Sequence, residues 1–394
     1  MTLEANEYFS VVVARIITNY VGDFSPFTGT VQRVVMAPTP PAGQMGRERV
    51  DFILPVGQNS VVGIRRHKVH AFNMNTGEPA WPIQAQRTPQ PISNAFCGGN
   101  SSMYGPQNVV VTIGNCLSVV SGVNGTRMGV IMTTHRATMR AAPLPNGYVM
   151  YWDSMNSEVK AFNANKAEEA LIMQPRKRKG EEEEIFKVLM LSSETHLAVV
   201  ADVKRVQLWE WRADLQEFMY TGGFKMPHRV FDLVELQDGR LLVRGQMNYL
   251  VIMEIPSFTI TKLEGHANQV SCMTELFDGR IVSSSFDNCV HVWKHSNVQN
   301  KWITEFTLRN HCGEWDMPNN NERNMDIGGI RGVVELPGGL IASCGVDRSI
   351  CIWSTHTGDL VNVLLDHDYL VNKIARIGRY LVSGDINGTM IVWM

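Results

Sequence analysis

The stretch LEGHANQVSCMTELFDGRIVSSSFDNCVHVW, residues 263–293, decides the fold. It contains an apolar segment, the pair Asp278-Gly279, and a second apolar segment. Glycine adopts the positive φ that a tight two-residue turn requires, so this pattern predicts a β-hairpin. A third short apolar segment, residues 289–293, follows at once and ends in Trp293. The stretch therefore predicts three consecutive short strands.

The same hairpin recurs along the chain. Copies lie at residues 234–245, 274–285 and 334–345, and a weaker copy lies at 374–385. Each has an apolar strand, a turn centred on Asp-Gly, Gly-Gly or Gly-Arg, and a second strand rich in branched apolar residues. Such residues favour strands and such turns favour hairpins, so the chain is predicted to be built from repeats.

The third strands form a ladder of end points through the whole sequence. These end points, clear at the three C-terminal tryptophans and looser upstream, are Phe72, Ser121, Phe162, Trp209, Met253, Trp293, Trp353 and Trp393. They lie 40–60 residues apart. A repeat of 40–50 residues with four short strands is typical of β-propeller blades. The sequence predicts an all-β chain, a single closed β-propeller of four-stranded blades. Eight blades are counted, and seven is the alternative.

Closure of this propeller needs one more strand. Residues 1–394 are interpreted as one propeller domain with its clearest repeats at 260–394. The sequence ends on the third strand of the last blade, residues 389–393, so this blade lacks an outer strand. The apolar segment YFSVVVARII, residues 8–17, precedes the first full blade and is predicted to supply it. Such closure removes an open sheet edge.

The stretch 263–293 resembles the WD40 repeat. In that family a histidine, a strand serine or threonine, a turn aspartate and a tryptophan hydrogen-bond in series within a blade. The resemblance assigns these roles to His266, Ser283, Asp287 and Trp293, to Ser343, Asp347 and Trp353 in the next blade, and to His367, Ser383, Asn387 and Trp393 in the last. The second of these blades has Asp326 at the histidine position, and in the last Asn387 replaces the aspartate. Before residue 186 little more than the period remains.

Two polar insertions interrupt the pattern. Residues 175–184, PRKRKGEEEE, place four basic residues beside four acidic ones, which predicts a solvated loop because opposite charges cancel. Residues 311–326 are polar with Trp315 in the middle. We expect a loop between blades there, and the sharper hypothesis makes Trp315 an interface anchor.

The segment Trp209-Glu210-Trp211-Arg212 resembles the Trp-Asp-x-Arg box by which some WD-repeat proteins dock on cullin-type ubiquitin ligase adaptors. Glu210 stands where that box has aspartate. A tryptophan and an arginine at a strand end also occur in ordinary blades, so plain structure is the favoured interpretation and docking the alternative.

Composition limits the partners and the compartment. The net charge is −2, so no overall field favours nucleic acid or an anionic membrane. Seven cysteines without CxxC spacing predict buried thiols rather than disulfides or a zinc site. No apolar stretch approaches the length of a membrane span, and the first twenty residues lack a signal-peptide pattern. We expect a cytoplasmic protein, with the nucleus as the alternative.

The chain carries no recognisable catalytic box. There is no HExxH, no sialidase box and no glycine-rich phosphate loop with a lysine, so no catalytic residue, metal or cofactor is assigned. The predicted partner-binding residues are His228, Asn268, Phe286, Trp315, Tyr369 and Ile386. Such an aromatic, weakly charged rim suits protein partners. The sequence predicts a non-enzymatic protein–protein interaction scaffold or adaptor subunit of a larger complex. The alternatives are a substrate receptor for a cullin-type ligase, and a channel-site enzyme or small-ligand binder.

Overall fold

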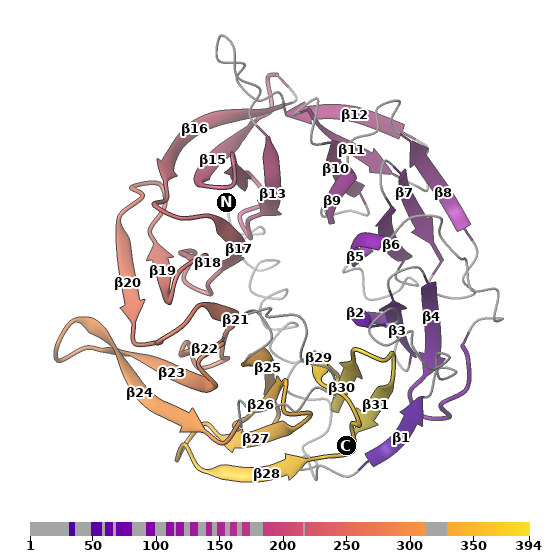
Figure 1. Ribbon diagram of the computed structural model, residues 1–394. Coiled ribbons are helices and arrows are strands. Elements are labelled where there is room, and N and C mark those ends of the chain that lie inside the picture. Colours follow the sequence, from indigo (N-terminus) through magenta and orange to yellow (C-terminus); the bar gives the residue numbers. More distant parts are fainter. Residues whose placement is uncertain are drawn as a thin grey trace, which may run out of the picture.

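A computed structural model describes fifteen segments of the chain. These are residues 31–35, 49–56, 60–65, 68–80, 92–98, 108–113, 116–121, 127–132, 139–143, 148–153, 158–163, 168–173, 184–215, 217–311 and 329–394. Every regular element within them is a β-strand, and the strands are arranged as a ring of small antiparallel sheets (Figure 1). This is the predicted β-propeller.

The described strands group into eight blades, in chain order from the ring's inside outward. The first blade contains β2 (Val50–Val56), β3 (Ser60–Arg65) and β4 (Lys68–Asn73), and the second contains β5 (Ile92–Gly98), β6 (Asn108–Ile113), β7 (Cys116–Val120) and β8 (Arg127–Met132). The third contains β9 (Met139–Pro143), β10 (Tyr148–Asp153), β11 (Val159–Asn163) and β12 (Glu168–Met173), the fourth β13 (Ile185–Met190), β14 (His196–Ala201), β15 (Arg205–Arg212) and β16 (Glu217–Lys225), and the fifth β17 (Val230–Glu235), β18 (Leu241–Gly245), β19 (Tyr249–Met253) and β20 (Ile260–Glu264). The sixth contains β21 (Val270–Glu275), β22 (Ile281–Ser285), β23 (Cys289–Ser296) and β24 (Lys301–Arg309), and the seventh β25 (Ile330–Leu336), β26 (Leu340–Gly345), β27 (Ile350–Ser354) and β28 (Leu360–Leu364). The third and fourth blades share one sheet through a single parallel pair, Met173 with Phe218.

The eighth blade joins the two ends of the described chain. Its strands are β29 (Val371–Ile377), β30 (Tyr380–Asp385), β31 (Met390–Trp393) and, outermost, β1 (Val31–Val35). β1 runs antiparallel to β31, with Val31 opposite Trp393 and Val35 opposite Met390. The predicted closure by an N-terminal strand is therefore present.

The segment predicted for this closing strand was wrong. β31 has two edges; β30 occupies one and β1 the other, so residues 8–17 cannot hold the assigned position. Residues 8–17 themselves lie outside the described segments. The sequence favoured them because they form the longer apolar run, whereas β1, VQRVV, is short and contains two polar residues.

The hydrophobic core lies between blades rather than within them. One cluster packs Val290 and Val292 of β23 against Ile341 and Trp353 of the next blade. Further clusters join the first blade to the second, the third to the fourth, the fourth to the fifth, the fifth to the sixth and the seventh to the eighth, and one joins the eighth to the first. A single blade therefore cannot bury its own apolar faces, and the ring is stabilised through its neighbour contacts.

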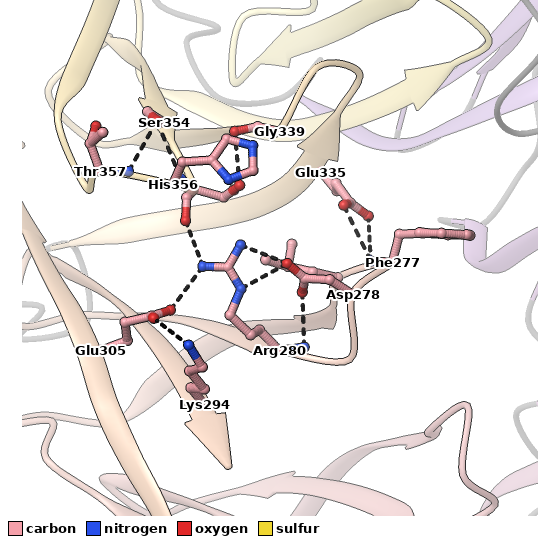
Figure 2. Close-up of polar contacts among 12 residues, drawn as sticks. Phe277, Asp278, Arg280, Lys294, Glu305, Glu335, Gly339, Ser354, His356 and Thr357 are labelled. Atoms are coloured by element: carbon pink, nitrogen blue, oxygen red, sulfur yellow. Dashed lines mark hydrogen bonds and ion pairs between the residues drawn. The ribbon is translucent and has the colours of Figure 1, made fainter. Parts of the chain in front are cut away.

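A repeated carboxylate also connects neighbouring blades. Glu235 accepts a hydrogen bond from the Ser192 backbone N–H at 2.6 Å, and Glu275 one from Gln237 at 2.8 Å. Glu335 does the same for Phe277 at 3.1 Å (Figure 2). In each case the last charged residue of an innermost strand binds the first turn residue of the preceding blade.

The junction between the seventh and eighth blades lacks this contact for a chemical reason. At the next junction the turn residue is Pro337, which has no N–H to bind, and the equivalent position of the eighth blade is Arg376 rather than glutamate. Burial raises the pKa of Glu275 and of Glu335, so the repeated carboxylates are partly desolvated.

Replacing both Val34 and Val35 by proline tests the closing strand. Successive N–H groups of a strand point to opposite sides, so the pair must remove at least one bond to β31. We expect a loss of about 1–3 kcal/mol in the free energy of unfolding, measured in urea. A larger loss from Val12→Pro/Val13→Pro would contradict the assignment of β1.

Candidate partner-binding face

A buried hydrogen-bond series fixes the sixth blade. His266 Nε2 lies 2.8 Å from Ser283 Oγ, and Trp293 Nε1 donates to the same oxygen at 2.8 Å. His266 Nδ1 lies 2.9 Å from Asp287 Oδ2. This carboxylate also accepts the backbone N–H groups of Ala267 and Cys289. The series ties the loop before β21 and the turn after β22 to the middle of the blade.

In the seventh blade the histidine of the series is His311, and the assignment of this position to Asp326 was wrong. His311 Nε2 lies 2.8 Å from Ser343 Oγ, and its Nδ1 lies 2.9 Å from Asp347 Oδ2. Trp353 Nε1 donates to Ser343 at 2.9 Å. Asp326 is outside the described residues.

The inserted residues between these two blades explain the wrong assignment. Asp326 has the same distance to the following innermost strand as the histidine of the sixth blade, but the position of the histidine is set by its distance from the preceding outer strand. The segment Leu308-Arg309-Asn310-His311 repeats the spacing of Leu263-Glu264-Gly265-His266, so the extra residues lie after the histidine. Asn310 fits where the sixth blade has Gly265 because Cys351 stands in place of the larger His291.

In the eighth blade the carboxylate comes from Asp385, so the assignment to Asn387 was also wrong. His367 Nε2 lies 2.7 Å from Ser383 Oγ and its Nδ1 3.2 Å from Asp385 Oδ2. Trp393 Nε1 donates to Ser383 at 2.8 Å, and Asn387 contributes its backbone N–H to Asp385 at 2.9 Å.

The seventh blade shows why a carboxylate can move by two residues. Asp385 takes the position of Gly345, where an added Cβ would lie 3.0 Å from both His311 Nδ1 and Asp347 Oδ1. A side chain at this position therefore points directly at the histidine. An aspartate there can replace the turn aspartate of the other two blades.

Burial and hydrogen bonding act in opposite directions on the pKa values of the ionisable groups in these series. Burial would raise the pKa of Asp287, but hydrogen bonds from His266 and from two backbone N–H groups hold it well below its usual range. Burial would lower the pKa of His311, but its hydrogen bonds to Asp347 and Cys351 raise it to about 9. His291 stacks on His266 with ring centroids 4.0 Å apart, and burial and that neighbour lower its pKa to about 4.

The series support one face of the ring, which we call the candidate face. It consists of the loops that precede innermost strands and the turns that link second to third strands, at 226–229, 246–248, 265–269, 286–288, 365–370 and 386–389. Backbone bonds join the two kinds of segment: Phe286 N–H donates to Gln269 at 3.1 Å and Ile386 N–H to Leu370 at 3.2 Å. The face is therefore a backbone-braced surface.

The structure brings five of the six predicted partner-binding residues to this face. His228 and Asn268 are exposed, and Phe286, Tyr369 and Ile386 are half-buried. The Asn268 side chain accepts the Gln269 N–H at 2.7 Å, which orients it. Trp315 lies outside the described residues, so its role stays a prediction.

A β-bulge lies beside this face in most blades, and the sequence did not reveal it. The register between the two inner strands skips the second residue of the innermost strand, at Asp51, Ser93, Phe186, Phe231, Ser271, Arg331 and Asn372. Bulges redirect side chains and are common near functional sites. No local sequence signal marks them, because the position holds acidic, basic, polar and aromatic residues.

Two bulged residues form arginine–aromatic pairs at the face. Arg331 lies over the Phe286 ring, 5.2 Å from its centroid. Arg244 lies 5.9 Å from the ring centroid of Phe231, which is 38% exposed. Arginine and aromatic side chains are enriched among residues that dominate binding energy at interfaces. The structure thus adds Arg331, Phe231 and Arg244 to the candidate residues.

A family model, "WD domain, G-beta repeat", matches residues 257–294, the segment that carries the sixth-blade series. Residues 257–294 thus form a WD40 repeat. Human F-box-like/WD repeat-containing protein TBL1X is 30% identical over 148 residues, 36% of this chain and 24% of that protein. Cell division cycle 20.1, cofactor of APC complex, from Arabidopsis thaliana is 26% identical over 175 residues, 42% of this chain and 35% of that protein.

Two further comparisons complete this picture. An uncharacterised WD repeat-containing protein of Schizosaccharomyces pombe is 26% identical over 198 residues, 41% of this chain and 53% of that protein. The chain therefore spans about a quarter to a half of these WD-repeat relatives. The computationally designed protein Ika8 superposes with a TM-score of 0.64 over 89% of this chain and 97% of its own, at 15% identity, which supports the fold alone.

The Trp209–Arg212 segment of this WD40 chain serves two structural purposes. Trp209 is buried and donates to Gln207 Oε1 at 3.0 Å, and Trp211 packs edge-on against Phe218. Arg212 pairs with Asp214 at 3.2 Å, and both are largely exposed. Trp209 is therefore closed to a partner, Trp211 is half-buried, and Glu210 and Arg212 are exposed.

Within the described ranges, no group of three or more His, Cys, Asp or Glu side chains is placed to hold a metal ion. No helix there has the length and apolar character to cross a bilayer. Cys272, Cys289, Cys344 and Cys351 are free thiols.

Replacing Ser343 by alanine tests the WD40 series. The buried Trp353 N–H and His311 Nε2 would both lose their partner, so we expect a loss of about 2–4 kcal/mol in the free energy of unfolding. Ser257→Ala, at an exposed turn, should change it by less than about 0.5 kcal/mol. Equal effects of the two variants in urea unfolding would contradict a stabilising role for the series.

The His311–Asp347 pair predicts an alkaline loss of stability. The folded-state pKa of His311, about 9, lies above its ordinary value of 6.5, so its stabilisation is complete below about pH 6.5 and lost as pH rises through 9. We expect the stability difference between the wild type and His311→Gln to shrink between pH 6.5 and pH 9 in urea unfolding. Asp347→Asn should remove the same pH-dependent component. Parallel curves for the wild type and His311→Gln would contradict this.

Proposed function

We propose that this chain is a non-enzymatic scaffold or adaptor subunit that binds protein partners through the candidate face. The observation that carries this is the Arg331–Phe286 pair, which joins two blades at the face with the Phe286 backbone braced by Gln269. Such a pair offers a large apolar surface and a planar cation in a fixed position, so little side-chain entropy is lost on binding.

The chemistry of the face favours a protein over a phosphate ligand. Arg244 already pairs with Asp232 at 3.7 Å, and the exposed Asn268 is neutral. The name of the Arabidopsis relative, cofactor of APC complex, supports membership of a larger assembly. On the ground of free thiols and the sequence pattern, the proposal includes a cytoplasmic site of action, with the nucleus as the alternative.

A second candidate is a substrate receptor that docks on a ligase adaptor. It rests on Glu210 and Arg212, which are exposed at the end of β15 away from the candidate face. A protein could use both surfaces at once, one for a substrate and one for the adaptor.

Affinity purification of the tagged chain from its native cells tests these proposals. We expect stoichiometric protein partners that are lost with Asn268→Ala/Phe286→Ala/Tyr369→Ala. The matched control is Phe277→Ala, because Phe277 is 40% exposed on the opposite face and its replacement should leave those partners bound. All variants should unfold within about 1 kcal/mol of the wild type, since they remove exposed or half-buried side chains.

The outcomes separate the candidates. A ligase adaptor that is lost with Arg212→Ala, while the triple variant retains it, would promote the second candidate. Partners that survive both the triple variant and Arg212→Ala would show that another surface binds them. A chain that elutes alone would overturn the scaffold proposal and favour a ligand in the channel.

A further inference from the structure

The outer strand of the seventh blade differs from its counterparts. β28 lies on the outer rim of the ring, and among the described residues no strand pairs with its outward edge (Figure 1). Two of its three exposed side chains are apolar, Leu360 at 40% and Val361 at 56%, and the third is the neutral Asn362. Leu365, which follows the strand, is 68% exposed.

Neighbouring outer strands of the same chain lack this character. The exposed residues of β20 are Thr261, Lys262 and Glu264. Those of β24 are Lys301, Thr304, Thr307 and Arg309. Charged residues on an open edge prevent pairing with other chains, and β28, LVNVL, contains none. Charged residues therefore protect the edges of β20 and β24 against pairing with another chain, whereas the edge of β28 is open to such pairing.

Acidic residues flank this edge. Asp359 precedes β28, and Asp366 and Asp368 follow it; all three are exposed. No cation forms an ion pair with them in the part of the chain that the structure describes. An incoming strand therefore meets an apolar centre with negative charge at both ends.

This charge pattern opposes a second copy of the chain as the occupant. In an antiparallel pair of two copies, residues 360–365 of one chain lie opposite the same residues of the other in reverse order. Asp359 of each copy then lies opposite Asp366 of the other. Like charges placed directly opposite destabilise a strand pair, whereas lysine or arginine at those positions stabilises it.

We propose that β28 is a docking edge for an extended segment of a partner protein, with alternating apolar residues at its centre and basic residues at its ends. The segment adds a fifth strand to the seventh blade. The Val363 N–H, which now donates to the Asn362 side chain at 2.8 Å, then donates to a carbonyl of the partner. This edge adjoins the candidate face at residues 365–368, but strand addition here does not depend on that face.

Binding of short labelled peptides to the full chain, followed by fluorescence anisotropy, tests this edge. The probe is Lys-Lys-Val-Thr-Val-Thr-Val-Lys-Lys, and its counterpart carries glutamate in place of lysine. We expect the lysine peptide to bind and the glutamate peptide to bind about tenfold more weakly or not at all.

Variants of the chain locate the binding. Val361→Lys, which gives β28 the protection of β20, and Asp359→Asn/Asp366→Asn should each weaken lysine-peptide binding about tenfold. The control Thr304→Lys adds the same charge to β24 and should leave binding unchanged, as should Asn268→Ala/Phe286→Ala/Tyr369→Ala. If Val361→Lys lowers the unfolding midpoint, the aspartate variant, whose side chains are exposed, decides.

Three results would overturn the proposal. The lysine peptide fails to bind the wild type, or it binds all variants equally, or the two peptides bind equally well. Wild-type dimers in sedimentation that Val361→Lys converts to monomers would replace the partner segment with a second copy of this chain.

Discussion

The shared burial between neighbouring blades is the constraint on which the rest of the structure depends. Because each apolar cluster draws side chains from two successive blades, every blade needs both neighbours, and the ring must close. The cluster between the eighth and first blades, which includes Val382 and Val50, extends this packing across the junction of the chain's two ends. β1 adds the backbone bonds that complete the last sheet.

Polar contacts then orient what the apolar core has assembled. The His–Ser–Trp–Asp series lies at one end of the strands and braces the loops of the candidate face. At the other end, Arg280 donates to Asp278, Glu305 and the Thr355 carbonyl, so it links the sixth blade to the seventh (Figure 2). With both ends held, the exposed side chains of each face keep fixed positions, which suits recognition of a partner by shape.

Three surfaces of different chemistry result from one repeat. The candidate face offers arginine–aromatic pairs, the end of β15 offers Glu210 and Arg212, and the outer rim offers the apolar edge of β28. Binding of different partners at these surfaces is what the proposed scaffold function requires.

The sequence by itself determined the repeated strand pattern and the WD40 character of the last blades, because turn chemistry and apolar alternation are local, and it left seven blades as the alternative to eight. It also indicated Ser283, Ser343 and Ser383, whose spacing from a tryptophan is constant. Only the tertiary structure decided that His311 and Asp385 complete their series and that β1 closes the ring. Those choices depend on which side chain or strand reaches a given point in space. The bulged residues such as Arg331 were likewise invisible, since a bulge is defined by the register between strands and not by the residue that occupies it.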